Sequence, residues 1–319
     1  MVLMKRFLII FLGIILAAAA FSPQAFAASS VIADSHSSTV LNRTMNFNVY
    51  LPPSYSSDTS KKFPVMYLLH GMYGSNTDWT SMGMQSIVDN AGGEEMVIIM
   101  PNGFNSFYIN GYQSGINYED YFHSELMPFV ESKYRIDAAN GKNRAIAGLS
   151  MGGYGAAYHG FKYPDKFSSA YAMSGALTVS GTVELSTVIN KNKYPAYAME
   201  CGTEDSLVYQ MNVSFHQKLQ SLGISHDYIT RSGTHSADFW KACLPKAILF
   251  ASEHFTSEPA TTPGDIDGDG QITAIDAGLL RRHLLGISTL TGNALKAADV
   301  NKDGEADAID LSLILKQLL

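Results

Sequence analysis

The stretch RAIAGLSMGGYGAAYHG, residues 144–160, begins as an apolar run, tightens around one serine between two glycines, and then becomes rich in alanine and glycine. This order predicts a buried strand, a sharp turn and a helix. Glycine is needed at Gly148 and Gly152 because the turn crowds the backbone, so that a Cβ would clash there. Ser150 is therefore expected at the carboxyl end of a strand, with its hydroxyl lifted clear of the sheet.

Other segments extend this strand–turn–helix unit in both directions. Short apolar runs that end in glycine or a polar residue predict further buried strands, and amphipathic runs between them predict helices. The expected strands begin at Val65, Met96, Ser168 and Pro195, and the expected helices span residues 118–134 and 209–223. This alternation predicts a mostly parallel α/β sheet, in which reactive groups gather at the carboxyl ends of the strands.

The G-x-S-x-G pattern around Ser150 is typical of a nucleophilic serine, which needs a histidine base and an acid. Of nine histidines, His235 is the candidate base, because it follows the expected strand that starts at His226 and precedes another helix. Glu204 and Asp205 both follow an earlier strand, and either could orient the imidazole. The order serine, acid, histidine along the chain is that of α/β hydrolases.

Two backbone amides are expected to stabilise the negative charge that develops during attack by the serine. One belongs to Met151, directly after the serine, and the other to Met72, in the segment LLHGMYGS at residues 68–75. Such a donor contributes about 3 kcal/mol to transition-state stabilisation. His70 is interpreted as a structural side chain that supports this segment. The aromatic loop at residues 105–118 either walls a substrate site or packs as an ordinary loop.

The first 27 residues have the layout of a secretory signal peptide. Lys5 and Arg6 precede an apolar stretch at residues 7–21, and a small-residue cleavage site follows at residues 25–27. The alternative is an uncleaved membrane anchor, but the apolar stretch is shorter than the ~20 residues that a spanning helix needs. We therefore expect a secreted protein with no membrane attachment after cleavage.

Composition excludes several other classes of protein. The formal net charge of −7 disfavours a nucleic-acid partner, which needs clustered lysine and arginine. Two cysteines, Cys201 and Cys243, are too few for a disulfide framework, and the sequence leaves open whether they pair.

The chain divides after the α/β region. Residues 28–255 form that region, residues 256–264 read as a Thr/Pro-rich linker, and residues 265–319 contain an internal repeat. DIDGDGQITAID at 265–276 and DVNKDGEADAID at 299–310 are offset by 34 residues, which two copies of a calcium-binding loop explain better than a solvated acidic tail. A helix is expected after each loop, and none before it. The candidate calcium ligands are Asp265, Asp267, Asp269, Gln271 and Asp276, and Asp299, Asn301, Asp303, Glu305 and Asp310.

Several motifs, in the correct order over most of residues 40–255, resemble the esterase D family and carbohydrate esterase family 1. They are YLLHGMYGSNTDW, AGLSMGGYGAAYHGFKYPDKFSSAYAMSGAL, CGTED and GTHSADFW. This family includes feruloyl esterases, acetylxylan esterases, S-formylglutathione hydrolases and mycolyltransferase-like proteins. The resemblance implies an α/β-hydrolase fold and a Ser–His–Asp triad, and CGTED favours Asp205 over Glu204 as the acid.

The duplicated loop and helix resemble a type I dockerin. That resemblance implies a small all-α domain that binds two calcium ions and docks to a cohesin on a scaffold protein, as in a cellulosome. The positions that contact the cohesin in this family carry the same two residues in both copies of the repeat. They are Ala274 and Ile275 in the first copy, and Ala308 and Ile309 in the second.

Together the two halves predict a secreted serine carboxylic-ester hydrolase. Its expected substrates are feruloyl or acetyl esters on plant cell-wall xylan, with no cofactor for catalysis. Two alternatives stay open, an acyltransferase of mycolyltransferase type and a non-catalytic carbohydrate-binding subunit.

Overall fold

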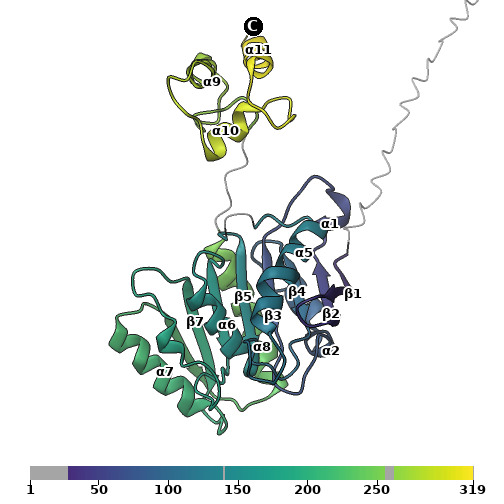
Figure 1. The fold of residues 1–319 in the computed structure, drawn as a ribbon, viewed down its shortest axis with the longest axis vertical. Coiled ribbons are helices and arrows are strands. Elements are labelled where there is room, and N and C mark those ends of the chain that lie inside the picture. The colour runs from purple at the N-terminus through teal and green to yellow at the C-terminus, as the bar shows by residue number, and fades with distance from the viewer. Residues whose placement is uncertain (1–27, 139–140, 256–261, 319) are drawn as a thin grey trace, which may run out of the picture.

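The computed structural model describes residues 28–138, 141–255 and 262–318. The expected signal peptide and most of the expected linker lie outside these residues. Residues up to Phe255 share two large apolar clusters on a common sheet, and the segment from Ile266 onward has an apolar core of its own (Figure 1).

One eight-stranded sheet organises the larger body, with the strand order β1-β2-β4-β3-β5-β6-β7-β8. Strands β1 and β2 pair antiparallel at one edge, and β2 pairs antiparallel with β4. All pairs from β4 to β8 are parallel, as the sequence predicts for the body of the sheet. The strands are β1 (Ser30–Ser38), β2 (Arg43–Leu51), β3 (Val65–Leu69), β4 (Val97–Pro101), β5 (Arg144–Leu149), β6 (Ser169–Met173), β7 (Ala196–Gly202) and β8 (Asp227–Arg231).

Helices cover both faces of this sheet, because successive side chains of a buried strand point to opposite faces. In β3, Tyr67 and Leu69 join the cluster of α5, α6 and α7, whereas Met66 and Leu68 join the cluster of α3 and α8. The helices of this body are α1 (Ser54–Ser57), α2 (Asp78–Ser81), α3 (Met84–Asp89), α4 (Tyr118–Tyr121), η1 (Phe122–Leu126), α5 (Met127–Lys133), α6 (Met151–Lys162), η2 (Leu185–Thr187), α7 (Tyr209–Leu222) and α8 (Ala237–His254).

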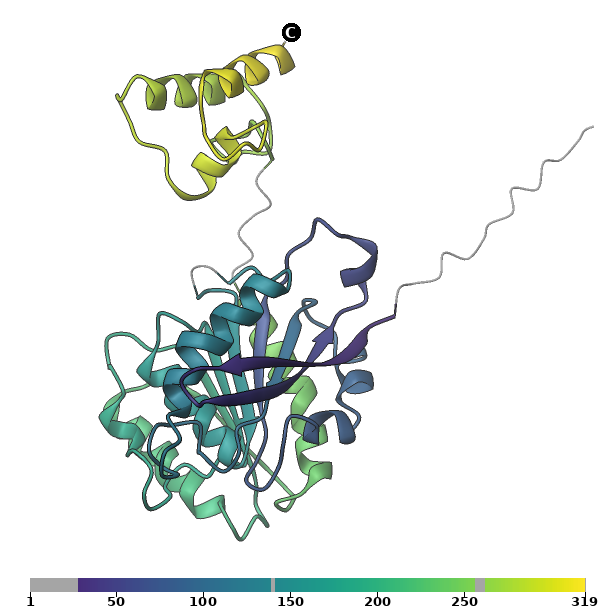
Figure 2. The same ribbon diagram turned by 45° about the vertical axis from the view of Figure 1, so that its right-hand side comes forward.

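A π-helical turn beside the edge of the sheet was not indicated by the sequence patterns. Figure 2 shows β1 and β2 as a long purple hairpin beside the helix formed by α4, η1 and α5. That helix, expected as one element over residues 118–134, contains the π-helical turn η1. Glu125 in this turn accepts hydrogen bonds from the backbone N–H groups of Thr39 and Val40. The turn therefore ties the β1–β2 connection to the helix layer.

The C-terminal body is a small helical domain, as expected. Its helices are α9 (Ala274–Leu284), α10 (Gly292–Ala298) and α11 (Ala308–Gln317). Leu280 and Ile314 are fully buried between α9 and α11, with Ala297 and Ala298 of α10 beside them. The expectation that no helix precedes either loop is wrong for the second, which α10 precedes directly. This short helix starts at a glycine with a positive φ, which conceals it in the sequence.

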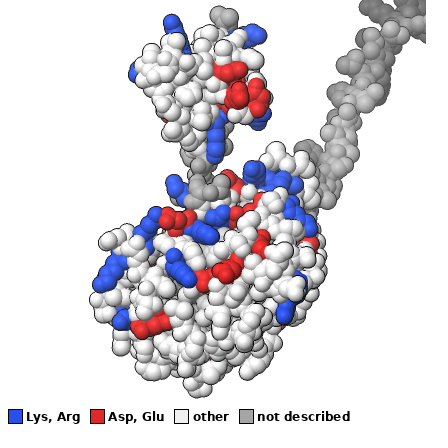
Figure 3. Space-filling view, viewed as in Figure 1, with Lys and Arg blue, Asp and Glu red and all other residues white. Residues whose placement is uncertain are grey.

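Three further observations bear on the expectations. Among the described residues, no helix is both long enough and apolar enough to cross a membrane. Cys201 and Cys243 are free, buried thiols, and burial raises the pKa of each to about 12. Charged side chains of both signs mix on the face seen in Figure 3, where no single-sign basic stripe is visible.

Candidate active site and calcium loops

Ser150 lies at the turn between β5 and α6, with φ 52° and ψ −114°. This left-handed backbone is strained for a residue other than glycine, and such strain concentrates at functional sites. The turn is also crowded, because a Cβ on Gly152 would lie 2.5 Å from the Leu69 carbonyl oxygen. Gly152 therefore allows α6 to start in direct contact with the end of β3, which determines the position of Ser150.

The structure brings Ser150, His235 and Asp205 into one line of contacts. The Ser150 Oγ lies 3.0 Å from His235 Nε2, and His235 Nδ1 lies 2.7 Å from Asp205 Oδ2. The other Asp205 oxygen accepts the backbone N–H groups of Leu207 and Val208, each at 3.1 Å. Asp205 is thus almost fully buried, with both of its oxygens bonded, and its position on the loop is fixed.

Glu204, the alternative acid, contacts the histidine loop but not the imidazole. Its backbone N–H donates to the Gly233 carbonyl at 3.0 Å, and its carboxylate accepts the Gly233 N–H in return. That backbone hydrogen bond is the main reason why the pKa of Glu204 lies below its ordinary value. The geometry therefore makes Asp205 the partner of His235. Glu204 instead joins its own loop, after β7, to the loop that carries Gly233 and His235.

The expected oxyanion segment runs alongside the serine. A Cβ built on Gly71 would lie only 3.5 Å from the Ser150 Cβ. Met72 and Met151 both line the cavity that contains Ser150. Each has a backbone amide, and that of Met151 belongs to the first turn of α6, where N–H groups have no partner within the helix.

His70 supports this segment, as expected. The Gly103 N–H donates to His70 Nε2 at 2.8 Å, so Nδ1 carries the ring proton and donates it to the Gly71 carbonyl at 2.6 Å. The Tyr108 hydroxyl donates to the His70 carbonyl at 3.0 Å. Burial lowers the pKa of His70, which keeps the ring neutral and able to accept the Gly103 N–H.

A mainly apolar cavity of about 490 Å³ opens over the serine. Of the aromatic loop at residues 105–118, only Phe107 lines this cavity, while Tyr108 and Tyr118 are fully buried and pack in the core. Three residues of the cavity wall were not singled out from the sequence, since they come from two loops and the start of α8, which only the folded sheet brings together. They are Tyr73, Leu207 and Trp240. The ring of Trp240 meets that of His235 edge-on, with centroids 5.0 Å apart.

The two acidic loops of the C-terminal domain share their main hydrogen bonds, 34 residues apart. Asp265 accepts the Gly270 N–H at 3.0 Å, and Asp299 accepts the Gly304 N–H at 2.9 Å. Fully buried Asp276 accepts three backbone N–H groups, and Asp310 repeats the same pattern. The structural repeat therefore follows the sequence repeat at these positions.

The first loop gathers oxygens that suit a hard cation. Ligand atoms of Asp265, Asp267 and Asp269 all lie within 4.8 Å of one another, and Asp267 and Asp269 are exposed. Calcium takes six to eight oxygen ligands, including carboxylates and backbone carbonyls. The second loop has oxygen-bearing residues at the same positions, with Asn301 in the place of Asp267.

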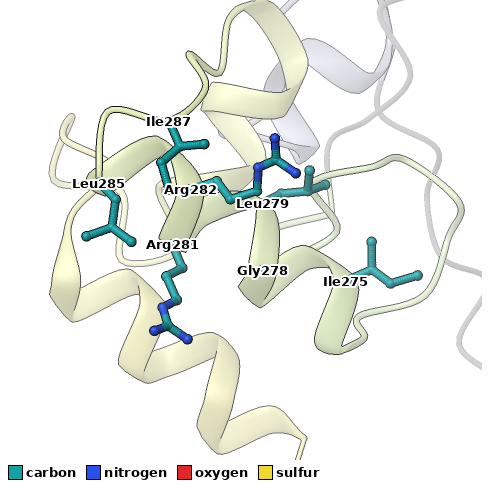
Figure 4. Close-up of a pocket in the computed structure, with 7 residues that line it drawn as sticks. All are labelled: Ile275, Gly278, Leu279, Arg281, Arg282, Leu285 and Ile287. Carbon is teal, nitrogen blue, oxygen red and sulfur yellow. The ribbon is translucent and has the colours of Figure 1, made fainter.

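The expected recognition residues lie on the surface. Ala274 and Ile275 at the start of α9 are exposed, as are Ala308 and Ile309 at the start of α11. Figure 4 shows Ile275 near the start of α9, along a shallow groove of apolar residues and two arginines, Arg281 and Arg282, that continues past the end of that helix to Leu285 and Ile287.

Comparison with known proteins identifies both bodies. A family model described as "Putative esterase" matches residues 38–251, about two thirds of the chain, and a "Dockerin type I domain" model matches residues 263–319. The chain belongs to the esterase family and carries a type I dockerin. It is a carboxylic ester hydrolase. Type I dockerins bind calcium and cohesins and are parts of extracellular cellulosome components.

Individual relatives agree with this assignment. An "Acetyl esterase" of Caldicellulosiruptor saccharolyticus is 27% identical over 61% of this chain and 85% of its own length. A solved structure titled "ferulic acid esterase" is 29% identical, with a TM-score of 0.66, over 72% of this chain and 99% of that chain. An "Endo-1,4-beta-xylanase/feruloyl esterase" of Xylanibacter ruminicola is 26% identical over 62% of this chain but only 28% of its own length.

Proposed function

We propose that this protein is a secreted serine esterase that removes feruloyl or acetyl esters from plant cell-wall xylan while docked to a cellulosome scaffold. The line of contacts from Ser150 through His235 to Asp205 carries the proposal. A hydroxyl at 3.0 Å from an imidazole nitrogen, with a buried carboxylate on the other nitrogen, is the arrangement that activates a serine.

In the first half of the reaction, Ser150 Oγ attacks the ester carbonyl and gives its proton to His235 Nε2. Asp205 holds the ring in the tautomer with Nε2 free and stabilises the imidazolium that forms. The amides of Met72 and Met151 donate to the developing oxyanion. His235 then protonates the leaving sugar oxygen, which leaves the acyl group on Ser150.

In the second half, water replaces the sugar. His235 takes a proton from that water, which attacks the acyl carbonyl, and the same amides stabilise the second oxyanion. His235 returns the proton to Ser150 Oγ as the acid departs. The cycle needs no metal or cofactor.

The cavity favours a feruloyl group over an acetyl group. Its volume of about 490 Å³ lies in the range that encloses whole small molecules, ~300–1,000 Å³, and far exceeds the needs of one acetyl group. Phe107, Tyr73 and Trp240 offer aromatic walls for the ring of a ferulate.

For the dockerin, we propose two calcium ions, one in each acidic loop. Side-chain oxygens at loop positions 1, 3, 5 and 12 and the backbone carbonyl at position 7 would hold each ion. The exposed pairs Ala274–Ile275 and Ala308–Ile309 would contact the cohesin, since small and apolar exposed residues suit the centre of an interface. Residues 1–27 would direct secretion before cleavage.

The deciding experiment offers the purified full-length chain feruloylated arabinoxylan and acetylated xylan side by side. Release of ferulate is expected to exceed release of acetate, and Ser150→Ala is the matched inactive control. Release of neither acid by the wild type would contradict the proposed substrates. An acyl product on an added alcohol, formed faster than free acid, would indicate the acyltransferase instead.

A further inference from the structure

A second hollow, of about 520 Å³, adjoins the catalytic cavity. We call it the polar hollow, and Tyr73 lines both it and the cavity over Ser150. Its wall includes Arg43, Tyr73, Asn102, Phe104, Asn105 and Gln113. Whereas the catalytic cavity is mainly apolar, this hollow presents several polar side chains around two aromatic rings.

Several polar groups of the hollow are available to a ligand. Among the described residues, neither the Arg43 guanidinium nor the Gln113 amide has a hydrogen-bond partner, and Arg43 only lies over the Phe104 ring at 5.2 Å. Asn105 uses its Oδ1 to accept the Tyr73 N–H at 2.7 Å, which leaves its amino group free to donate. These N–H groups match hydroxyl oxygens, which accept hydrogen bonds from neutral and charged donors alike.

The two aromatic residues of the hollow are held in strained conformations. Tyr73 has φ 66° and Phe104 has φ 50°, both in the left-handed region that bulky residues avoid. Tyr73 is also 87% exposed, although it is a large aromatic side chain. Backbone strain of this kind concentrates at active sites and ligand clamps. The Tyr73 ring is therefore an exposed aromatic surface that borders both cavities.

The strand order decides which part of a substrate can reach the hollow. Arg43 begins β2 and Asn102 follows β4, whereas His235 follows β8 at the other edge of the sheet, with Ser150 after β5 between them. Because His235 must protonate the leaving oxygen, the sugar that carries the ester lies on the His235 side of the serine. The hollow lies on the other side of the serine, so the sugar that carries the ester does not fill it, and a further unit of the chain is the polar part of the substrate that remains to do so.

We propose that the polar hollow binds an unesterified sugar unit of the polysaccharide that carries the ester. The inference rests on the proposed function and extends it, since it predicts that this esterase favours a polymer over an acylated monosaccharide. Tyr73 would stack on the sugar, and Arg43 and Gln113 would donate to its hydroxyl groups.

The test compares kcat/KM for an acylated monosaccharide and an acylated xylo-oligosaccharide that bear the same acyl group. The wild type is expected to prefer the oligosaccharide. The double variant Arg43→Ala/Gln113→Ala should lose about tenfold on the oligosaccharide, as expected for one or two lost hydrogen bonds, and less than about twofold on the monosaccharide. Lys62→Ala/Gln217→Ala, which removes one exposed cation and one exposed amide elsewhere, is the matched control and should leave both values unchanged.

Equal kcat/KM for the two lengths in the wild type, or an equal loss on both substrates in the double variant, would overturn the inference and leave the serine mechanism intact. Failure of the wild type to hydrolyse either sugar ester would instead overturn the proposed function, and the inference with it.

Discussion

The esterase domain and the dockerin both depend on precisely placed carboxylates, but they hold them in opposite ways. Asp205 is buried, and its two oxygens are bonded to His235 and to two backbone amides at 2.7–3.1 Å. In the dockerin, Asp265, Asp267 and Asp269 crowd their ligand atoms within 4.8 Å, and two of the three are exposed. Like charges at that spacing repel one another unless a cation lies between them.

The difference lies in what completes each site. The large sheet, with helices on both faces, already fixes the three strand ends that carry the proposed triad, so the folded protein brings its three side chains together without a further ligand. The dockerin has a small core around Leu280 and Ile314, and we propose that its loops gain their stability from bound calcium. The following predictions challenge this contrast, in order of their expected effect on ester hydrolysis.

Ser150→Ala should reduce kcat for an aryl acetate by roughly 10⁴-fold or more, because the nucleophile is lost. The fold should survive, since the change removes only one hydroxyl from a turn that Gly152 and β3 hold in place. Turnover and thermal melting of the same sample measure both effects. Retention of most of the activity, at an unchanged melting temperature, would show that Ser150 is not the nucleophile.

Asp205→Asn should reduce kcat/KM by about 10³–10⁴-fold, because an amide cannot hold the His235 tautomer or stabilise its imidazolium. Glu204→Gln is the matched control. Its side-chain oxygen can still accept the Gly233 N–H, so the loss should stay below about threefold. If the two variants ranked in the opposite order, the acid would be Glu204.

His70→Ala should cost about tenfold in kcat, since the segment that bears Met72 loses its hydrogen bonds to Gly103 and Gly71 and the donor shifts from its place. The KM should change little, because the ring does not line the cavity. His254→Ala, at the far end of α8, is the control. A large rise in KM at constant kcat would instead place His70 in substrate binding.

The esterase core follows closely from its sequence, whereas the walls of its cavity do not. A glycine on either side of Ser150 encodes the turn, and apolar runs encode β3 to β7, because local chemistry decides both. The choice between Glu204 and Asp205 depends on which of two adjacent carboxylates the turn directs toward His235. The positions of the two residues in the sequence do not decide between them. Tyr73 belongs to the loop after β3 and Trp240 to the start of α8, and these segments meet only across the folded sheet, which is why no spacing reveals them.

In the dockerin, the repeat predicts both loops and the helices after them, but not α10. Calcium loops are encoded by residue type at fixed positions, so the 34-residue offset locates Asp265 and Asp299 without any knowledge of the fold. Helix α10 has no such signal. It is short, starts at Gly292, and is held by the burial of Ala297 and Ala298 against the other two helices.

Removal of calcium should change hydrolysis least of all, by less than about twofold, while it unfolds the dockerin. A segment of fewer than ~60 residues buries too little apolar surface to hold crowded carboxylates together without a cation. The full-length chain, with and without EDTA, is assayed on an aryl acetate and exposed to a protease, and mass spectrometry locates the cuts. We expect cleavage within residues 265–318 only after chelation, and protection when calcium, but not magnesium, is restored, because magnesium is smaller and gives up its waters reluctantly.

The variant Asp265→Asn/Asp299→Asn supplies the matched control for that measurement, since it removes one ligand charge from each loop and should require more calcium for protection. If chelation abolished hydrolysis while the esterase domain stayed folded, a metal would serve the active site and the contrast between the two domains would fail. If the dockerin resisted the protease without calcium, its small core would suffice, and the acidic loops would not depend on an ion for their fold.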